Sequence, residues 1–498
     1  MKTLALILLA ALGARAAAAE TIKIRVYHTN DIHGWIMPRP DKFQTGRLIG
    51  GASALASVIA KETGPKLLLD AGDWWQGTPE GSLTKGASVA EIFNAIGYDA
   101  LVVGNHEYDA GVDELRALIA KMKMPVLSAN TYGADGKRPS WVQPWIIKEV
   151  AGVKVGIFGL TTSRLPHLSF SKNIEGLTFR REVDEARDAV AALKKEGATV
   201  IIALTHVGVE KEGEKFMGDR AIAREVPGID LIVGGHSHTF LSRPIRENGV
   251  LIVQAGSFLV KVGRATLEID PKTKKIAASS DELLDLWPDR VGEDPAAKAI
   301  VAKYADLVGK EFETVIATAT VALSRGGASE SSLGDWMTDC YREGLVADIA
   351  LQNGGGIRAD LPSGPVMLRQ LFNLMPFDNA LVKIFMKGAD LRAALEYGLG
   401  MTRVIQISGA VLEYRRGKPA GQRLVAATIG GAAIDDTKTY SIATLDFVAD
   451  GGEGYTAFDR FISSDTTGIL ARDMLGECAR RQKAIVPPAM GRLILKGD

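Results

Sequence analysis

The sequence has little cysteine and no excess of charge of either sign, and each absence excludes a class of protein. Only two cysteines, Cys340 and Cys478, occur among 498 residues, so the chain is not a scaffold held together mainly by disulfides. Whether these two cysteines pair is left open. Basic and acidic residues number 59 each, which argues against a protein that binds nucleic-acid polymers through a basic surface. Any anionic ligand must therefore be held by a local group of side chains.

No apolar run reaches the roughly 20 consecutive residues that a membrane helix needs. Residues 1–19 combine Lys2, an apolar stretch from Leu4 to Leu12 and a run of alanines, which is typical of a secretory signal peptide. No cysteine lies near this region to carry a lipid, and the last residues, GRLILKGD, end in charge without an apolar tail. We therefore expect a periplasmic or secreted protein without a membrane anchor.

The length and the pattern of apolar residues predict two α/β domains. A chain of this length exceeds what one hydrophobic core usually organises. Over residues 20–290, short runs of Val, Ile and Leu alternate with segments of helical spacing, and several runs lack polar alternation, as buried strands of a layered core do. Residues 291–315 are amphipathic and rich in helix formers, which predicts a connecting helix. A second, smaller α/β domain is expected over 316–498.

Five of the seven histidines closely follow strand-like runs, in clusters that also contain aspartate, asparagine and glycine. In chain order the clusters are TNDIHG, AGDWWQG, GNHEYDAG, THVG and GGHSH. Side chains at the carboxyl ends of strands in an α/β sheet converge on one crevice, so clusters that are distant in sequence can meet there. The side chains expected to converge there as metal ligands are two aspartates, one asparagine and several histidines.

This mixture of oxygen and nitrogen ligands suits Zn, Mn, Fe or Co more than Ca or Mg. One carboxylate can bridge two such ions. A pair of ions about 3.5 to 4 Å apart lowers the pKa of a bridging water and neutralises a phosphoryl oxygen, which in-line attack on a phosphoester requires. A single Asp or His near a strand end is more often a structural hydrogen bonder. Five clusters in order, most of them flanked by glycine, favour two divalent metal ions instead.

The five clusters resemble the ordered pattern of the calcineurin-like metallophosphoesterases, which is DxH, GD, GNHE, a lone His and GHxH. The resemblance implies a layered β-sandwich with flanking helices. It implies that His106 stabilises developing charge or assists the leaving oxygen while Asp109 orients it, whereas Glu107 is expected to be structural. The two implied metal sites share Asp73, and are formed by Asp31, His33, Asp73 and His238, and by Asp73, Asn105, His206 and His236.

The second half of the chain resembles the substrate-binding domain of 5'-nucleotidases, including bacterial periplasmic members that also cleave UDP-sugars. The motifs that carry this resemblance are NGGGIR (353–358), MPFDN (375–379) and LDFVADGGEGY (445–455). It implies that Phe377 and Phe447 stack on the two faces of a base. Without the resemblance, each of these phenylalanines would be assigned to the domain core.

The same resemblance implies a set of polar contacts to the nucleotide. Asn379 and Glu453 would hold the base or ribose, although the family usually has Asp where Glu453 stands. Arg358 would bind phosphate through its planar fork of donors, with Asn353 nearby. A further phosphate-binding arginine normally precedes the segment found here as ESSLG, and Arg325 is the only candidate.

Together the motifs predict a phosphomonoesterase that releases phosphate from nucleoside 5'-monophosphates, with UDP-sugars and nucleoside di- or triphosphates as further candidate substrates. Three alternatives stay open. A 2',3'-cyclic-nucleotide 2'-phosphodiesterase/3'-nucleotidase is similar in both domains but usually carries Asn at the position of Asp109. A more distant relative acts on protein-bound thiosulfate. A non-enzymatic nucleotide-binding protein is expected to have lost a metal ligand, and none is missing here. The metal identity, the preferred nucleotide and the oligomeric state are left open.

Overall fold

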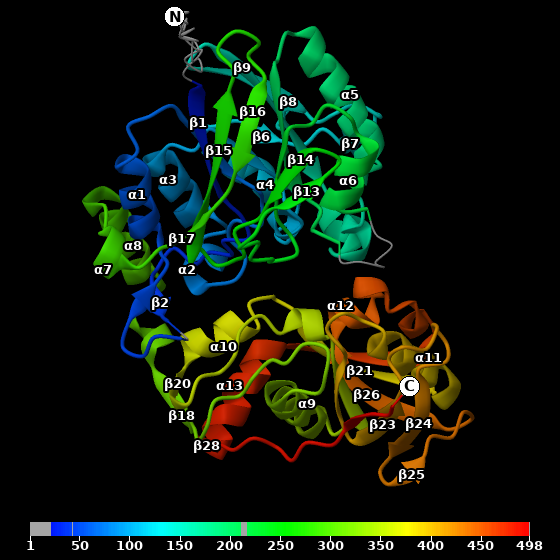
Figure 1. Ribbon diagram of the computed structural model, residues 1–498. Coiled ribbons are helices and arrows are strands. Elements are labelled where there is room, and N and C mark those ends of the chain that lie inside the picture. Colours follow the sequence, from blue (N-terminus) through cyan, green and yellow to red (C-terminus); the bar gives the residue numbers. More distant parts are fainter. Residues whose placement is uncertain (1–20, 42, 211–216, 498) are drawn as a thin grey trace, which may run out of the picture.

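Two β-sheets face each other in the N-terminal half of the computed structural model, which describes residues 21–41, 43–210 and 217–497 (Figure 1). The signal peptide expected over 1–19 lies outside these residues. The first sheet has the order β16-β15-β1-β4-β5-β6, with β17 also paired to β15. Its strands are β1 (Ile22–Thr29), β4 (Lys66–Asp70), β5 (Ala100–Val102), β6 (Val126–Leu127), β15 (Lys261–Ile269), β16 (Ile276–Ser280) and β17 (Leu283–Asp285).

The second sheet has the order β13-β14-β12-β11-β9-β8. Within it β9, β11, β12 and β14 are parallel, as β1, β4, β5 and β6 are in the first sheet. The carboxyl ends of each parallel set therefore share one edge of the sheet. The strands are β8 (Trp145–Val150), β9 (Val153–Thr161), β11 (Val200–His206), β12 (Leu231–Gly234), β13 (Ile245–Glu247) and β14 (Val250–Val253).

An apolar core fills the space between the two sheets. Val26 and Leu69 of the first sheet and Ile157, Ile202 and Val233 of the second are fully buried in it. Because both faces of each sheet are covered, these strands are nearly continuous apolar runs. Helices α1 (Ala52–Ala60), α3 (Ala87–Ile96) and α4 (Val112–Ile119) cover the first sheet, and α5 (Glu182–Lys195) and α6 (Asp219–Glu225) cover the second. The predicted layered β-sandwich with flanking helices is confirmed.

The segment expected to connect the domains contains α8 (Pro295–Val308) and a 3-10 turn, η4 (Lys310–Glu313). The Asp294 side chain caps α8 by accepting a hydrogen bond from the Ala297 amide at 2.9 Å. Val301 and Tyr304 are buried against α1 and α3. The helix is therefore part of the helical layer of the first domain, and the chain crosses to the second domain after it.

The second domain packs helices around a five-stranded sheet with the order β22-β19-β26-β21-β27. Two smaller sheets, β20-β18-β28 and β25-β24-β23-β29, complete it. None of the helices in the described residues of either domain is long and apolar enough to cross a membrane. The elements used below are β19 (Ile349–Gln352), β21 (Ala380–Lys387), β26 (Thr439–Leu445), α9 (Ser332–Leu345), α10 (Leu368–Leu374), α11 (Gly388–Leu399), α12 (Asp446–Ala449) and α13 (Ala471–Gln482). The remaining strands are β18 (Val315–Ala319), β20 (Gly364–Met367), β22 (Gln406–Ser408), β23 (Ala410–Tyr414), β24 (Leu424–Ile429), β25 (Ala432–Ala433), β27 (Ser463–Leu470), β28 (Ala484–Ile485) and β29 (Leu493–Leu495).

The two cysteines form a disulfide that joins α9 to α13, which answers the question the sequence left open. Both residues are buried in the core of the second domain. The bridge closes a loop with a sequence separation of 138 residues. A crosslink over so long a loop restricts the unfolded chain strongly, by about 5 kcal/mol in the chain-entropy model.

Replacing both Cys340 and Cys478 with alanine should therefore lower the thermal midpoint of the protein clearly. The catalytic constants at 25 °C should stay close to those of the wild type, because neither cysteine lines the cavity described below. Differential scanning calorimetry and steady-state kinetics on the double variant check both expectations. An unchanged midpoint would show that the bridge contributes little to stability.

Candidate functional site

The seven predicted metal ligands lie at the carboxyl ends of five strands. Asp31 and His33 follow β1, and Asp73 follows β4. The other four lie at the ends of the next strands, with Asn105 after β5, His206 as the last residue of β11, and His236 and His238 after β12. Three of these strands belong to the first sheet and two to the second, so the ligands converge at the edge where the two sheets meet.

Two groups of these side chains lie close enough to hold a metal ion, and Asp73 belongs to both. Asp31, His33, Asp73 and His238 offer ligand atoms within 4.8 Å of one another, and so do Asp73, His206 and His236. The side-chain oxygen of Asn105 lies 2.8 Å from His236 Nδ1 and 3.2 Å from His206 Nε2. The residues thus gather in the two sets that the sequence pattern implies.

The orientation of the histidine rings fits divalent cations. His33 Nδ1 lies 2.8 Å from the Gln76 carbonyl oxygen, and His206 Nδ1 lies 2.6 Å from that of Ala71. A carbonyl can only accept, so each Nδ1 carries a proton and each Nε2 is the ring nitrogen left to bind a metal ion. His33 Nε2 lies 3.0 Å from His238 Nε2, and His206 Nε2 lies 3.1 Å from the Asp73 carboxylate. This convergence of ring nitrogens and a carboxylate suits metal ligands oriented by backbone carbonyls.

The backbone at these ligands is held in an unusual conformation. Asp31, His33, Asp73, His236 and His238 have φ angles of 51°, 51°, 58°, 73° and 53°. Residues other than glycine rarely adopt the left-handed region, and such residues concentrate at functional sites.

Hydrogen bonds fix the turn that carries Asp73. The buried carboxylate of Glu107 accepts from the amides of Asp73, Trp74 and Gly104 at 2.9, 2.7 and 2.7 Å. Glu107 therefore has a structural role, because three donors from two separate turns bind to one side chain.

His106 and Asp109 form a hydrogen-bonded pair at the rim of the two groups of candidate metal ligands, which are called the metal clusters below. His106 Nδ1 lies 2.7 Å from Asp109 Oδ2, and His106 Nε2 lies 4.0 Å from Asp73 Oδ2. Burial lowers the pKa of His106, but the carboxylates of Asp109 and Asp73 outweigh it and raise the pKa. For Asp73 burial raises the pKa, yet the rings of His206, His106 and His33 hold it well below its usual range. The site thus favours a charged carboxylate beside a protonated imidazole.

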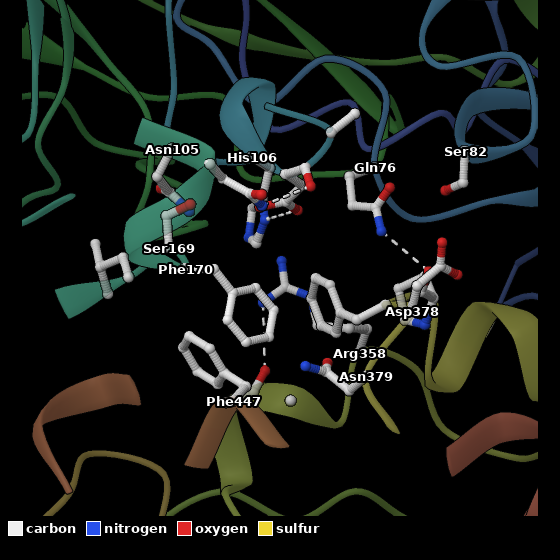
Figure 2. Close-up of a pocket in the computed structure, with 18 of the residues that line it drawn as sticks. Gln76, Ser82, Asn105, His106, Ser169, Phe170, Arg358, Asp378, Asn379 and Phe447 are labelled. Carbon is white, nitrogen blue, oxygen red and sulfur yellow. Dashed lines mark hydrogen bonds and ion pairs between the residues drawn. The ribbon is translucent and has the colours of Figure 1, made fainter. Parts of the chain in front are cut away.

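A cavity of about 480 Å³ lies between the two domains and opens onto the metal clusters (Figure 2). The first domain contributes Asp73, Asn105, His106, Asp109, His236 and His238 to its wall. The second contributes six predicted substrate residues, Asn353, Arg358, Phe377, Asn379, Phe447 and Glu453. Asp31, His33 and His206 are fully buried behind this wall, and Arg325 does not line the cavity.

Phe377 and Phe447 are only partly buried and face the cavity from the second domain. Phe377 precedes β21 and stacks on the His106 ring, with centroids 5.5 Å apart and an interplanar angle of 26°. Phe447 lies in α12 against Gly452. Figure 2 shows Phe170 of the first domain beside Phe447, and their centroids lie 5.5 Å apart in an edge-to-face arrangement. Phe170 is absent from the sequence-based predictions because its segment, LSFSKN, carries no recognisable motif.

The predicted polar substrate residues of the second domain make the following contacts within the protein. Arg358 Nη2 lies 3.1 Å from His33 Nε2, which brings the guanidinium to the edge of the metal clusters. Arg325 donates from Nη1 to the Arg358 carbonyl oxygen at 2.7 Å and so stands behind it. The carboxylate of Glu453 lies against Gly355, where a Cβ atom would meet Glu453 Oε1 at 2.1 Å. Asn379 Nδ2 donates to Asp446 Oδ1 at 3.2 Å, close to Phe447.

Comparison with known proteins matches each half of the chain to a family model. The calcineurin-like phosphoesterase model matches residues 24–240, and the model of the 5'-nucleotidase C-terminal domain matches residues 315–460. A snake venom 5'-nucleotidase from Gloydius brevicauda is 30% identical over 97% of this chain and 90% of its own length. The crystal structure of a 5'-nucleotidase precursor from Thermus thermophilus superimposes with a TM-score of 0.88 at 29% identity, covering 96% of this chain and 100% of that one.

The sulfate thiohydrolase SoxB of Thermus thermophilus shares the fold, with a TM-score of 0.83 at 19% identity over 95% of this chain and 97% of that one. Both resemblances stated from the sequence are confirmed, and the non-enzymatic alternative is set aside. The chain therefore belongs to the 5'-nucleotidase family and is a metal-dependent phosphoric ester hydrolase.

Proposed function

We propose that this protein is a secreted or periplasmic enzyme that hydrolyses nucleoside 5'-monophosphates to nucleoside and phosphate with two divalent metal ions. The observation that carries the proposal is the single cavity whose wall joins His106 and Asp73 of the first domain to Phe377 and Phe447 of the second. One nucleotide could place its phosphate at the metal clusters and its base between the two domains in this cavity.

The two clusters would hold the ions, with Asp73 as the ligand common to both. Two bound ions would lower the pKa of an attacking water and offset charge on the phosphoryl oxygens. Arg358, at the edge of the clusters, presents a planar fork of donors that matches two phosphoryl oxygens. It would orient the phosphate and hold the phosphoryl group beside the clusters.

His106 would act on the leaving oxygen. The Asp109 carboxylate can only accept, so His106 Nδ1 carries one proton, and Nε2 carries a second N–H directed toward the cavity when the ring is protonated. Asp109 fixes the ring orientation and favours the protonated form. Asp109 is itself anchored, because Asn173 Nδ2 donates to its carbonyl oxygen at 2.8 Å. A proton held on Nε2 would neutralise the nucleoside 5'-oxygen as it leaves.

A panel of substrates tests this assignment against its relatives. Phosphate release should be measured from 5'-AMP, 3'-AMP, 2',3'-cyclic AMP and UDP-glucose, with Mn, Co or Zn added. We expect 5'-AMP to give the highest kcat/KM. A preference for the 3' or cyclic nucleotide would replace the proposal with the 2'-phosphodiesterase/3'-nucleotidase alternative.

Replacing Phe377 or Phe447 with alanine should reduce kcat/KM on 5'-AMP by about fivefold to a hundredfold, because base stacking contributes about 1 to 3 kcal/mol. Hydrolysis of p-nitrophenyl phosphate should fall much less, since that substrate carries no base. Both variants should fold, because these side chains are only partly buried.

Phe458 provides the matched control, because it is fully buried in the core of the same domain. Phe458→Ala should cost about 3 to 5 kcal/mol of stability and affect both substrates alike. If Phe377→Ala and Phe447→Ala behave like Phe458→Ala, both rings belong to the core and the base site lies elsewhere.

A further inference from the structure

Residues 168–173, which run from the end of η2 (Leu165–His167) into η3 (Ser171–Ile174), bring part of the first domain to the wall of the cavity. This stretch is called the Phe170 segment below. Figure 2 shows the Phe170 ring pointing from the first domain toward Phe447 of the second. The residues of the segment that line the cavity are Leu168, Ser169, Phe170, Lys172 and Asn173. The first domain thus contributes a phenylalanine to a cavity whose other phenylalanines belong to the second domain.

The Phe170 segment is anchored on both sides and from within. Leu165 and Ile174, which flank the segment, are buried in the core of the first domain. The Asn173 amide donates to the Phe170 carbonyl oxygen at 2.9 Å, and the Asn173 side chain donates to the Asp109 carbonyl oxygen at 2.8 Å. The Phe170 ring is therefore presented by a fixed backbone, and a group that is already held in place costs less to order when a ligand binds.

On the other side of the contact, Phe447 is supported by the Gly-rich turn of the second domain. A Cβ atom on Gly452 would meet the Phe447 ring atoms Cε2 and Cζ at 2.6 Å, so the ring lies directly on this glycine. The rings of Phe170 and Phe447 lie 5.5 Å apart at an interplanar angle of 79°. Because η2 also packs against η6 (Gly452–Gly454), the two rings belong to a wider junction between the domains.

The position of Phe170 offers more than a contact between the domains. Its ring is only partly buried, and it lines the cavity although Phe447 lies beside it. A partly exposed aromatic ring in a cavity offers contact to a planar ligand and loses further apolar surface to water when that ligand binds. Because the two rings are nearly perpendicular, a base stacked on Phe447 would meet Phe170 at its side.

We propose that Phe170 contacts the base of the substrate, so that the base is recognised by three phenylalanines, two from the second domain and one from the first. The inference rests on the proposed function, because it takes the base to lie at Phe377 and Phe447. It assigns to the first domain, which carries the metal clusters, a part in selecting nucleotides over phosphate esters that have no base.

The test uses the metal-loaded, full-length protein and compares two substrates, 5'-AMP and ribose 5-phosphate. Both release phosphate from the 5'-oxygen of ribose, but only 5'-AMP carries a base. In Phe170→Ala we expect kcat/KM on 5'-AMP, divided by that on ribose 5-phosphate, to fall about threefold to tenfold, because one aromatic contact is of this size. Phe170→Leu should also lower this ratio, since leucine keeps an apolar contact with the second domain but removes the ring.

Phe43→Ala is the matched control, because Phe43 belongs to the same domain, is 94% exposed and does not line the cavity. We expect it to keep the wild-type ratio of the two substrates. An unchanged ratio in Phe170→Ala, even if both activities fall together, would show that the ring only joins the two domains and would overturn the inference.

The second measurement is the affinity of adenosine for the same metal-loaded proteins by calorimetry, which needs no turnover. Adenosine carries the base and the ribose without the phosphate, and we expect its affinity to fall by a similar factor in Phe170→Ala but not in Phe43→Ala. If the wild-type enzyme does not hydrolyse 5'-AMP, the proposed function is wrong, and adenosine binding then decides the role of Phe170. Equal adenosine affinities in the wild type and in Phe170→Ala would contradict the contact with the base.

Discussion

Asp73→Asn should lower kcat/KM on 5'-AMP by about 10³-fold or more, which corresponds to about 4 kcal/mol of the activation barrier. Asp73 Oδ1 accepts a hydrogen bond from the His106 amide at 2.9 Å, and an asparagine oxygen can keep that bond. The other oxygen lies 3.1 Å from His206 Nε2 and 3.7 Å from His33 Nε2. An NH₂ group there would carry no charge and no lone pair for a metal, so both sites should lose affinity.

Metal content measured on the purified Asp73→Asn variant should fall together with activity. Asp70→Asn is the matched control, because Asp70 is a buried aspartate at the end of the same strand. Burial raises the pKa of Asp70 to about 8, so its carboxyl group is largely neutral at pH 7. An asparagine can still accept from the Gly72 amide and donate to the Thr29 hydroxyl, which now bind the two carboxyl oxygens at 2.9 and 2.6 Å. Full metal content and near-normal turnover in Asp73→Asn would refute the assignment of Asp73 as a ligand shared by both metal sites.

His106→Ala should lower kcat by about 10²-fold to 10⁴-fold while both metal ions stay bound, the usual range for a positioned acid–base group. The ring lies at the rim of the clusters, and its Nδ1 is taken by Asp109. Measuring kcat for phosphate release from 5'-AMP, together with the metal content of the variant, separates a chemical role of His106 from a structural one.

Two further observations make the test of His106 specific. Asp109→Asn should give a smaller decrease than His106→Ala, because the asparagine oxygen can still orient the ring without supplying charge. The Phe377 ring stacks on His106, so the thermal midpoint of His106→Ala should be recorded as well. Unchanged kcat, or loss of metal together with activity, would remove His106 from the chemistry.

The metal clusters could be predicted from the sequence because they follow one topological rule. Each predicted ligand stands at or just after the end of a buried parallel strand, and such ends meet at one edge of a sheet. His28 is not one of these ligands, although it is the second-to-last residue of β1, because its Nε2 contacts Asp281 Oδ1 at 3.1 Å.

The contacts between the domains could not be predicted in the same way. Phe170 and Phe447 meet only because the two domains pack against each other. Phe447 was predicted from its motif just after β26, whereas Phe170 lies in a segment without a motif. The left-handed backbone conformation at the ligands could not be predicted either, because the preference of Asp and His for this conformation is too weak to identify it from one sequence.

The most direct test of the account is a titration of metal into the stripped enzyme, followed by phosphate release from 5'-AMP. Prolonged dialysis against a chelator should abolish the activity. Adding back Mn, Co or Zn should restore it, with a plateau at two equivalents per chain, because the ligands form two clusters that share Asp73. Activity that survives removal of the metal, or that returns in full with a single equivalent, would contradict the two-metal account of this site.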